Sequence, residues 1–223
     1  RKNLVPALLL IVSTGFGMQN AVAQNAELQK HAASFGELFV MNGQGRIEPI
    51  NTLASEVLVK LSKKDSYNGM SANEVFLSML AERDRWKSEA IFKVPEESIQ
   101  KLLGITGSNA AYNDFVDPSG KYKLSAEVEA AYKKKPAQRS QHNKGIINLD
   151  ERLNVFFMVM STSILKIFPT INGTVYSWST PKELHKQFGH DSENGDLFEA
   201  YTTNLTEAFS TGNFEKANAS LQK

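Results

Sequence analysis

Residues 149–164 read LDERLNVFFMVMSTSI, and this stretch decides the fold. Its large apolar residues recur at the three- and four-residue spacing of an amphipathic helix: Leu149, Leu153, Phe156, Phe157, Met160 and Ile164. Full burial of one such side chain stabilises a protein by about 1.5–3 kcal/mol. We therefore expect a central core helix here, closed by Phe168-Pro169.

Several other segments carry helix-start signals or the same apolar spacing. Ser71 and Glu74 form a capping box, and Pro95 and Gly104 bracket a short helix. Further helices are expected after residue 51, from residue 125 to the lysines at 133–135, over 181–188 and 196–210, and in the tail from residue 213. Short strands are expected at 91–94 and 175–178. The fold class predicted is mainly α with a small β-hairpin.

That hairpin lies near the start of the chain. Residues 38–41 and 46–48 read as its strands, and the turn at 42–45 contains two glycines, which tolerate a positive φ. Pro49 stops the second strand, and Asn51 or Thr52 can cap the helix that follows.

The first 24 residues differ in composition from the rest. Two basic residues precede an apolar stretch from Leu4 to Met18, and Ala21-Val22-Ala23 offers a small-x-small cleavage pattern. A cleaved signal peptide and a transmembrane helix both fit residues 1–24. In either case we expect residues 25–223 to form one globular helical domain on the outer side of the cytoplasmic membrane, facing the periplasm. The polar loop at 136–145 is where that domain would subdivide.

Composition excludes several kinds of function. The 223 residues include no cysteine, so disulfides, thiolate nucleophiles and cysteine-ligated metals are excluded. The net charge is +1, and the lysines are spread along the chain. This pattern argues against nucleic acid as a partner, because binding it requires a concentrated basic face. The chain also lacks a nucleophile elbow, a zinc-protease helix and a phosphate-binding loop.

The histidines and tryptophans leave alternatives open. His185 and His190 precede acidic residues at 191, 193 and 196, but their five-residue spacing does not place both on one helix face, so a solvated loop is favoured over a metal site. His31 is expected to be a polar surface residue, with contact to haem or a partner as the alternative. Trp86 and Trp178, with Tyr112, either belong to the core or form a recognition surface.

A resemblance to a known family adds to this. The runs FGELFV at 35–40 and GRIEPINTLASEVL at 45–58, preceded by His31-Ala32, resemble the start of the extracytoplasmic domain in System II cytochrome c biogenesis proteins of the ResB/CcsA fusion type. Further matches follow in order at similar spacing, to about residue 180: Asn68-Gly69, YKKKPA at 132–137, DERLN at 150–154, IFP at 167–169 and Trp178-Ser179.

The resemblance implies that the parent protein delivers haem and attaches it covalently to apocytochrome c. It implies membrane-embedded ResB/CcsA regions and apocytochrome c as partners, with haem handled by the parent and none assigned to this chain. No catalytic residue carries over, so an accessory, non-catalytic domain is expected; the alternative is a secreted periplasmic binding or scaffold protein. The candidate motif or interaction residues are His31, Arg46, Pro49, Asn51, Thr52, Trp86, Arg152 and Trp178. Arg46 could pair with a carboxylate, although turn and helix-start roles for its motif are favoured.

Overall fold

The computed structural model describes residues 14–172, 175–188 and 193–222. The helices are α1 (Thr14–Gly36), α2 (Ile50–Ser62), α3 (Ala72–Ala81), α4 (Arg83–Ser88), α5 (Glu97–Leu103), α6 (Ser125–Tyr132), α7 (Gln141–Met160), α8 (Pro181–Phe188), α9 (Glu193–Thr211) and α10 (Glu215–Ser220), with 3₁₀ turns η1 (Tyr112–Phe115) and η2 (Pro136–Gln138). The strands are β1 (Phe39–Met41), β2 (Ile47–Pro49), β3 (Ser66–Tyr67), β4 (Met70–Ser71), β5 (Phe92–Lys93), β6 (Asn109–Ala110), β7 (Phe168–Asn172) and β8 (Val175–Ser179). The mainly α fold class is confirmed.

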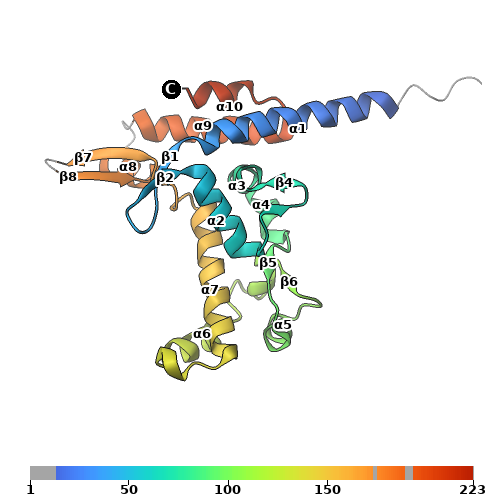
Figure 1. Ribbon diagram of the computed structural model, residues 1–223, viewed down its shortest axis with the longest axis vertical. Helices are drawn as coiled ribbons and strands as arrows, with labels where there is room; N and C mark the ends of the chain where they lie inside the picture. Colours follow the sequence, from blue (N-terminus) through green and yellow to red (C-terminus); the bar gives the residue numbers. More distant parts are fainter. Residues whose placement is uncertain (1–13, 173–174, 189–192, 223) are drawn as a thin grey trace, which may run out of the picture.

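Two groups of helices meet in the middle of the molecule (Figure 1). Helices α1, α9 and α10 lie side by side at one end, and α2 and α7 run away from them toward α5 and α6 at the other end. Helix α3 joins the groups because it contacts α1, α2, α7 and α9. One cluster of buried side chains extends from Ala32 in α1 to Ala217 in α10, so the described residues share a single core.

The most buried helix is α3, not the one that the sequence favours. Every residue from Val75 to Leu80 is buried. Helix α7 instead packs along one face, and Phe157 is 60% exposed on the other. The helix predicted at 149–164 therefore does contribute to the core, but it is not the most buried helix, and Phe157 does not face the core as predicted. The short α3 needs no apolar stripe because neighbours surround it on all sides.

The ends of α7 also differ from the prediction. The helix begins at Gln141 and is capped by Ser140, whose hydroxyl accepts from the Asn143 backbone N–H, so it takes up the second half of the predicted loop at 136–145. It ends at Met160, well before Phe168. A turn follows, in which Thr162 has a φ of 58°.

The strands form four separate antiparallel pairs in the described residues. The predicted hairpin is confirmed as β1–β2, and the segments predicted at 91–94 and 175–178 correspond to β5 and β8. The β3–β4 hairpin was not predicted, although its turn Asn68-Gly69 has positive φ at both residues and is a strong hairpin signal. Strand β7, the partner of β8, was also missed because Phe168-Pro169 reads as a helix stop.

The predicted N-terminal segment lies partly outside the described residues, which begin at Thr14. Helix α1 runs without a break from there to Gly36, across the boundary predicted at residue 24. No helix in the described part of the chain has both the length and the apolar character needed to cross a bilayer.

Candidate functional site

The β7–β8 hairpin carries an apolar face that its neighbours leave open. Pro169 pairs with Trp178 and Ile171 pairs with Tyr176, so these four side chains stand on one face of the hairpin. Ile171 is 68% exposed and Tyr176 is 81% exposed, while Trp178 is half-buried. The opposite face carries Thr170, Ser177 and Ser179, which hydrogen-bond to one another, and Phe168, which packs on Phe198 of α9.

The β1–β2 hairpin lies beside it and is apolar in the same way (Figure 1). Phe39 and Ile47 are both more than half exposed and stand on the face of the hairpin opposite buried Val40. The Met41 backbone N–H donates to the Lys166 carbonyl at 2.9 Å, which ties this hairpin to the segment leading into β7. We call the exposed apolar residues of the two hairpins the hairpin surface: Phe39, Ile47, Pro169, Ile171, Tyr176 and Trp178.

The motif from Gly45 to Thr52 forms the turn of β1–β2 and the start of α2. The Asn42 side-chain oxygen accepts from the backbone N–H groups of Gln44 and Arg46, at 3.0 and 3.1 Å, and holds the turn closed. The Arg46 side chain is exposed beside the hairpin surface. Pro49 is the N-cap of α2.

Asn51 and Thr52 do not cap that helix, which corrects the prediction. Helix α2 begins at Ile50 with Pro49 as its N-cap, in the extended conformation that this position requires, and there is no side-chain cap hydrogen bond because proline has no polar side-chain atom. Both residues instead lie on the exposed first turn and border an open depression of about 570 Å³, opposite Asn73.

His31 is fully buried, so its prediction as a surface residue was wrong. Its Nδ1 lies 2.7 Å from Asn218 Oδ1 in α10, and its Nε2 lies 3.0 Å from the Tyr201 hydroxyl in α9. The ring also packs against Tyr201 and Phe214. Burial lowers the pKa of His31, against the opposing effect of its Asn218 hydrogen bond, and burial raises the pKa of Tyr201. His31 is therefore not accessible for contact with haem or with a partner protein in this structure.

Trp86 is also fully buried and cannot belong to a recognition surface. Its indole N–H donates to Ser78 Oγ at 2.8 Å, and that hydroxyl donates to Glu82 Oε2 at 2.7 Å. Arg85 closes the network with an ion pair to Glu82 and a position over the Trp86 ring. Of the two tryptophans, Trp178 is the one that remains partly accessible.

Arg152 is buried on α7, where its Nη1 donates to the Lys93 carbonyl of β5. Its Nε has no hydrogen-bond partner, and the side chain lines a cavity of about 220 Å³. Of the eight residues singled out in the sequence, only Arg152 combines burial with an unsatisfied polar atom.

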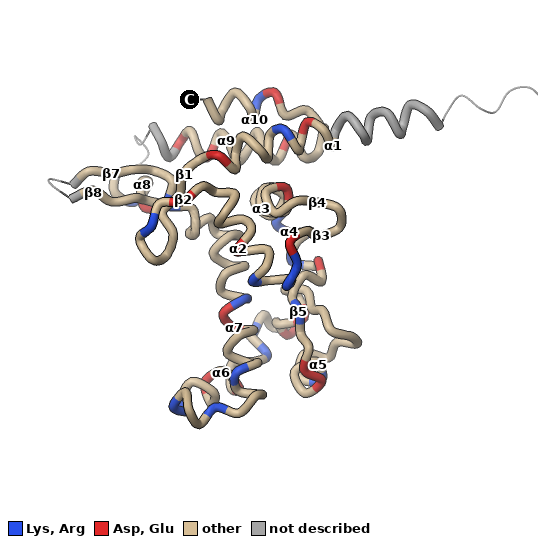
Figure 2. The backbone as a smooth tube through the Cα atoms, in the orientation of Figure 1, with Lys and Arg blue, Asp and Glu red and all other residues tan. Residues whose placement is uncertain are grey.

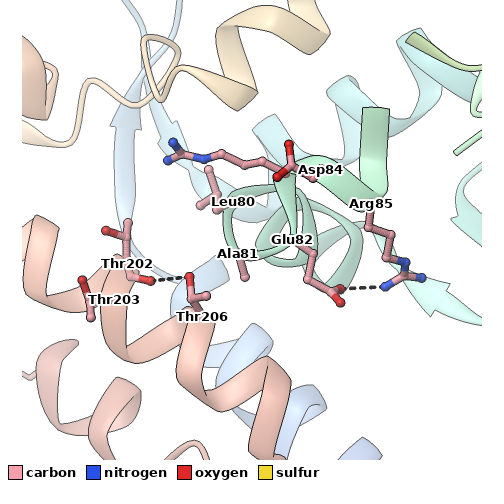
Figure 3. A pocket seen from close by; sticks show the side chains of 9 residues that line it. Leu80, Ala81, Glu82, Asp84, Arg85, Thr202, Thr203 and Thr206 are labelled. Carbon is pink, nitrogen blue, oxygen red and sulfur yellow. Dashed lines mark hydrogen bonds and ion pairs between the residues drawn. The ribbon is translucent and has the colours of Figure 1, made fainter. Parts of the chain in front are cut away.

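An open groove of about 460 Å³ lies between the α3–α4 corner and α9 (Figure 3). Glu82, Arg83, Asp84 and Arg85 line one side, and threonines of α9 line the other. Glu82 is paired with Arg85, and the Thr206 hydroxyl donates to the backbone carbonyl of Thr202. Asp84 is paired with Lys87 outside the groove, so most of these polar groups already have partners.

One serine–histidine contact was missed by the sequence analysis. Ser98 Oγ lies 3.0 Å from His142 Nδ1, and Glu96 Oε2 lies 3.7 Å from the same nitrogen. A hydrolytic triad needs the acid and the serine on opposite ring nitrogens. Both groups here meet Nδ1, so the histidine cannot pass a proton between them.

Three side chains near the end of α8 could hold a metal ion. The ligand atoms of His185, Asp196 and Glu199 lie within 4.8 Å of one another. His185 and Asp196 were also candidates in the sequence, whereas His190 and Asp191 lie outside the described residues. Asp196 and Glu199 are exposed, and acidic groups often cluster at surfaces without a metal.

Charges of both signs are interspersed over the described elements (Figure 2). The described residues therefore show no concentrated charged face. Their two candidate features are the apolar hairpin surface and Arg152, which is buried without a counter-ion.

Comparison with known proteins gives one relative. No family model matches the chain. Over 156 residues the chain is 40% identical to Protein NrfI of Wolinella succinogenes. The match covers 70% of this chain but 17% of that protein, so the chain corresponds to a small part of a much larger molecule.

Proposed function

We propose that this domain is the extracytoplasmic accessory part of a cytochrome c synthase of the ResB/CcsA fusion type. It helps to deliver haem to apocytochrome c by holding other parts of the machine in place. The similarity to Protein NrfI carries the coarser part of the proposal, a role in cytochrome c maturation. The sequence motifs at 31–58 carry the family assignment.

The hairpin surface supports a role in binding another protein. Exposed aromatic and branched apolar side chains on one face cost solubility unless they meet a partner, and aromatics are enriched at binding interfaces. Tyr176 and Ile171 stand directly opposite each other at the most exposed part of this face. The partners we propose are the membrane-embedded regions of the parent protein and apocytochrome c.

Substitutions on the hairpin surface test this function. The full-length parent protein carrying Ile171→Ser and Tyr176→Ser should fold but attach less haem to c-type cytochromes, measured by haem staining of the cells' proteins. Phe157→Ser provides a control, because Phe157 is also exposed, at 60%, but on a different element, α7. Full haem attachment by the double variant would remove the role of this surface.

The location is tested separately. Residues 1–223 contain no cysteine, so a Ser210→Cys substitution at an exposed position of α9 gives one defined label site within this domain. A membrane-impermeant maleimide should label it in intact spheroplasts. Labelling only after lysis would place the domain in the cytoplasm and overturn the proposal.

A further inference from the structure

The cavity beside Arg152 has the character of a binding site. It lies between the segment that joins β5 to α5 and the first turns of α7. Its volume of about 220 Å³ suits a small group, not a whole cofactor. Its charged side chains are Lys93, Glu96, Lys144 and Arg152.

Arg152 lacks a counter-ion in this cavity. The residue is 7% exposed, and no carboxylate among the described residues lies within ion-pair distance of its guanidinium. A buried charge without a partner is costly, so such groups are normally paired. Repulsion from Arg152 also contributes, after burial, to lowering the pKa of Lys63, the residue that directly follows helix α2. The positive charge of Arg152 therefore disfavours the charged form of a neighbouring lysine.

One edge of the guanidinium has no hydrogen-bond partner among the described residues. Nη1 is fixed by its hydrogen bond to the Lys93 carbonyl, whereas Nε is buried and unpartnered. Nε and Nη2 share the edge opposite Nη1, and two parallel N–H groups on such an edge match the two oxygens of a carboxylate. The anchored Nη1 holds this edge in place before a ligand arrives.

The other charges limit what can bind. Lys144 is exposed at the cavity, and Lys93 Nζ is held by Ser108 Oγ at 2.6 Å. Glu96 is the acidic group of the lining and lies against Gly145, where an added Cβ would stand 2.0 Å from its Oε1. Because Glu96 repels a second negative charge, the cavity favours an ion with one charge over a phosphate or dicarboxylate.

We propose that this cavity binds a single carboxylate group at the guanidinium of Arg152. The carboxylate belongs either to a small free acid or to an acidic side chain of a polypeptide. This inference does not depend on the proposed function, because it rests on the cavity and its charges alone.

The test uses the Arg152 Nε–H signal in ¹⁵N NMR spectra of the full chain, titrated at constant ionic strength. Acetate should move this signal downfield in a saturable way with a dissociation constant of about 1 mM, and chloride should not. A capped tripeptide with a central glutamate, compared with its glutamine counterpart, identifies the source. Tighter binding of the glutamate peptide than of acetate points to a polypeptide side chain, and equal or weaker binding points to a free acid.

The acetate affinity of two variants, measured by isothermal titration calorimetry, tests whether Arg152 and Glu96 form the site. Arg152→Lys should weaken binding about tenfold or more, because lysine lacks the paired donors. Glu96→Gln should strengthen it by roughly threefold to tenfold by removing the like charge, and this result stands even if Arg152→Lys does not fold. Lys216→Gln, a charge change on α10, should leave the affinity unchanged. Absence of saturable binding, or affinity unaffected by Glu96→Gln, overturns the proposal.

Discussion

The Nε2 atom of His31 lies 3.0 Å from the hydroxyl oxygen of Tyr201, although 170 positions separate the two residues in the chain. This contact joins α1 to α9, and the Nδ1 contact with Asn218 joins α1 to α10. Asn218 Oδ1 can only accept, so Nδ1 carries the proton and Nε2 accepts from Tyr201. The neutral imidazole therefore satisfies both partners at once.

His31 should make the stability of the protein depend on pH. Because burial lowers its pKa, the unfolded state takes up a proton before the folded state as the pH falls. We expect a constant free energy of unfolding above the unfolded pKa of about 6.5, and a decrease below it. Urea denaturation from about pH 8 to pH 5 measures this slope.

His31→Ala should lower the free energy of unfolding by about 3 kcal/mol at the upper end of that range, through the cavity and the polar groups left unpaired. It should also reduce the slope. His142→Gln, at a partly exposed histidine, should leave the slope in place. An unchanged slope in His31→Ala would contradict the assignment.

The Ser78 hydroxyl should be needed for the stability of α3 and α4. Ser78→Ala leaves the buried Trp86 N–H without its acceptor and removes one of the two donors to Glu82, so the free energy of unfolding should fall by about 1–3 kcal/mol. Ser210→Ala, which removes an exposed hydroxyl from α9, should change it by less than about 0.5 kcal/mol. Equal effects in thermal or urea unfolding would show that the Ser78 network contributes nothing.

The two tryptophans should respond differently to a quencher. In the Trp178→Phe variant the remaining Trp86 is fully buried, so its fluorescence should be blue-shifted and protected from acrylamide. In the Trp86→Phe variant the remaining Trp178 should be quenched readily. Similar quenching constants for the two variants would mean that Trp178 is covered.

Gly69 should be sensitive to substitution, and Gly43 should not. Gly69 has a φ of +80°, a conformation in which a Cβ is strained, so Gly69→Ala should cost about 1 kcal/mol of stability. Gly43 has no positive φ and nothing within 4 Å of an added Cβ, so Gly43→Ala should be neutral or slightly stabilising. Thermal unfolding of the two variants decides the matter, and equal losses would argue against the β3–β4 turn.

Local signals predicted the helices well, since caps and apolar spacing act within a few residues. The capping box at Ser71 and Glu74 forms as expected, and Gly104 ends α5 with a φ of 75°. The ranking of helices by burial failed, because burial depends on how many neighbours surround an element. Helix α3 carries fewer large side chains than α7, yet α1, α2, α4, α7 and α9 all contact it.

The roles of single residues were harder to predict. His31 and Trp86 look like surface candidates in the sequence, and both are buried because partners distant in the chain satisfy their polar atoms. Arg152 was named only as part of a matching motif. Its unpaired Nε follows from the position of β5 against α7, which no local pattern contains.

Helix α10 sets the minimum length of a folding unit. It supplies Asn218 to the His31 ring, and Phe214 just before it packs on the same ring. A shortened version ending at Thr211 would leave a buried imidazole with one unpaired nitrogen and would uncover the face of α9 on which Phe209 packs against Phe214. Any crystallisation or binding fragment of this protein therefore has to keep the last helix, short and distant in sequence as it is.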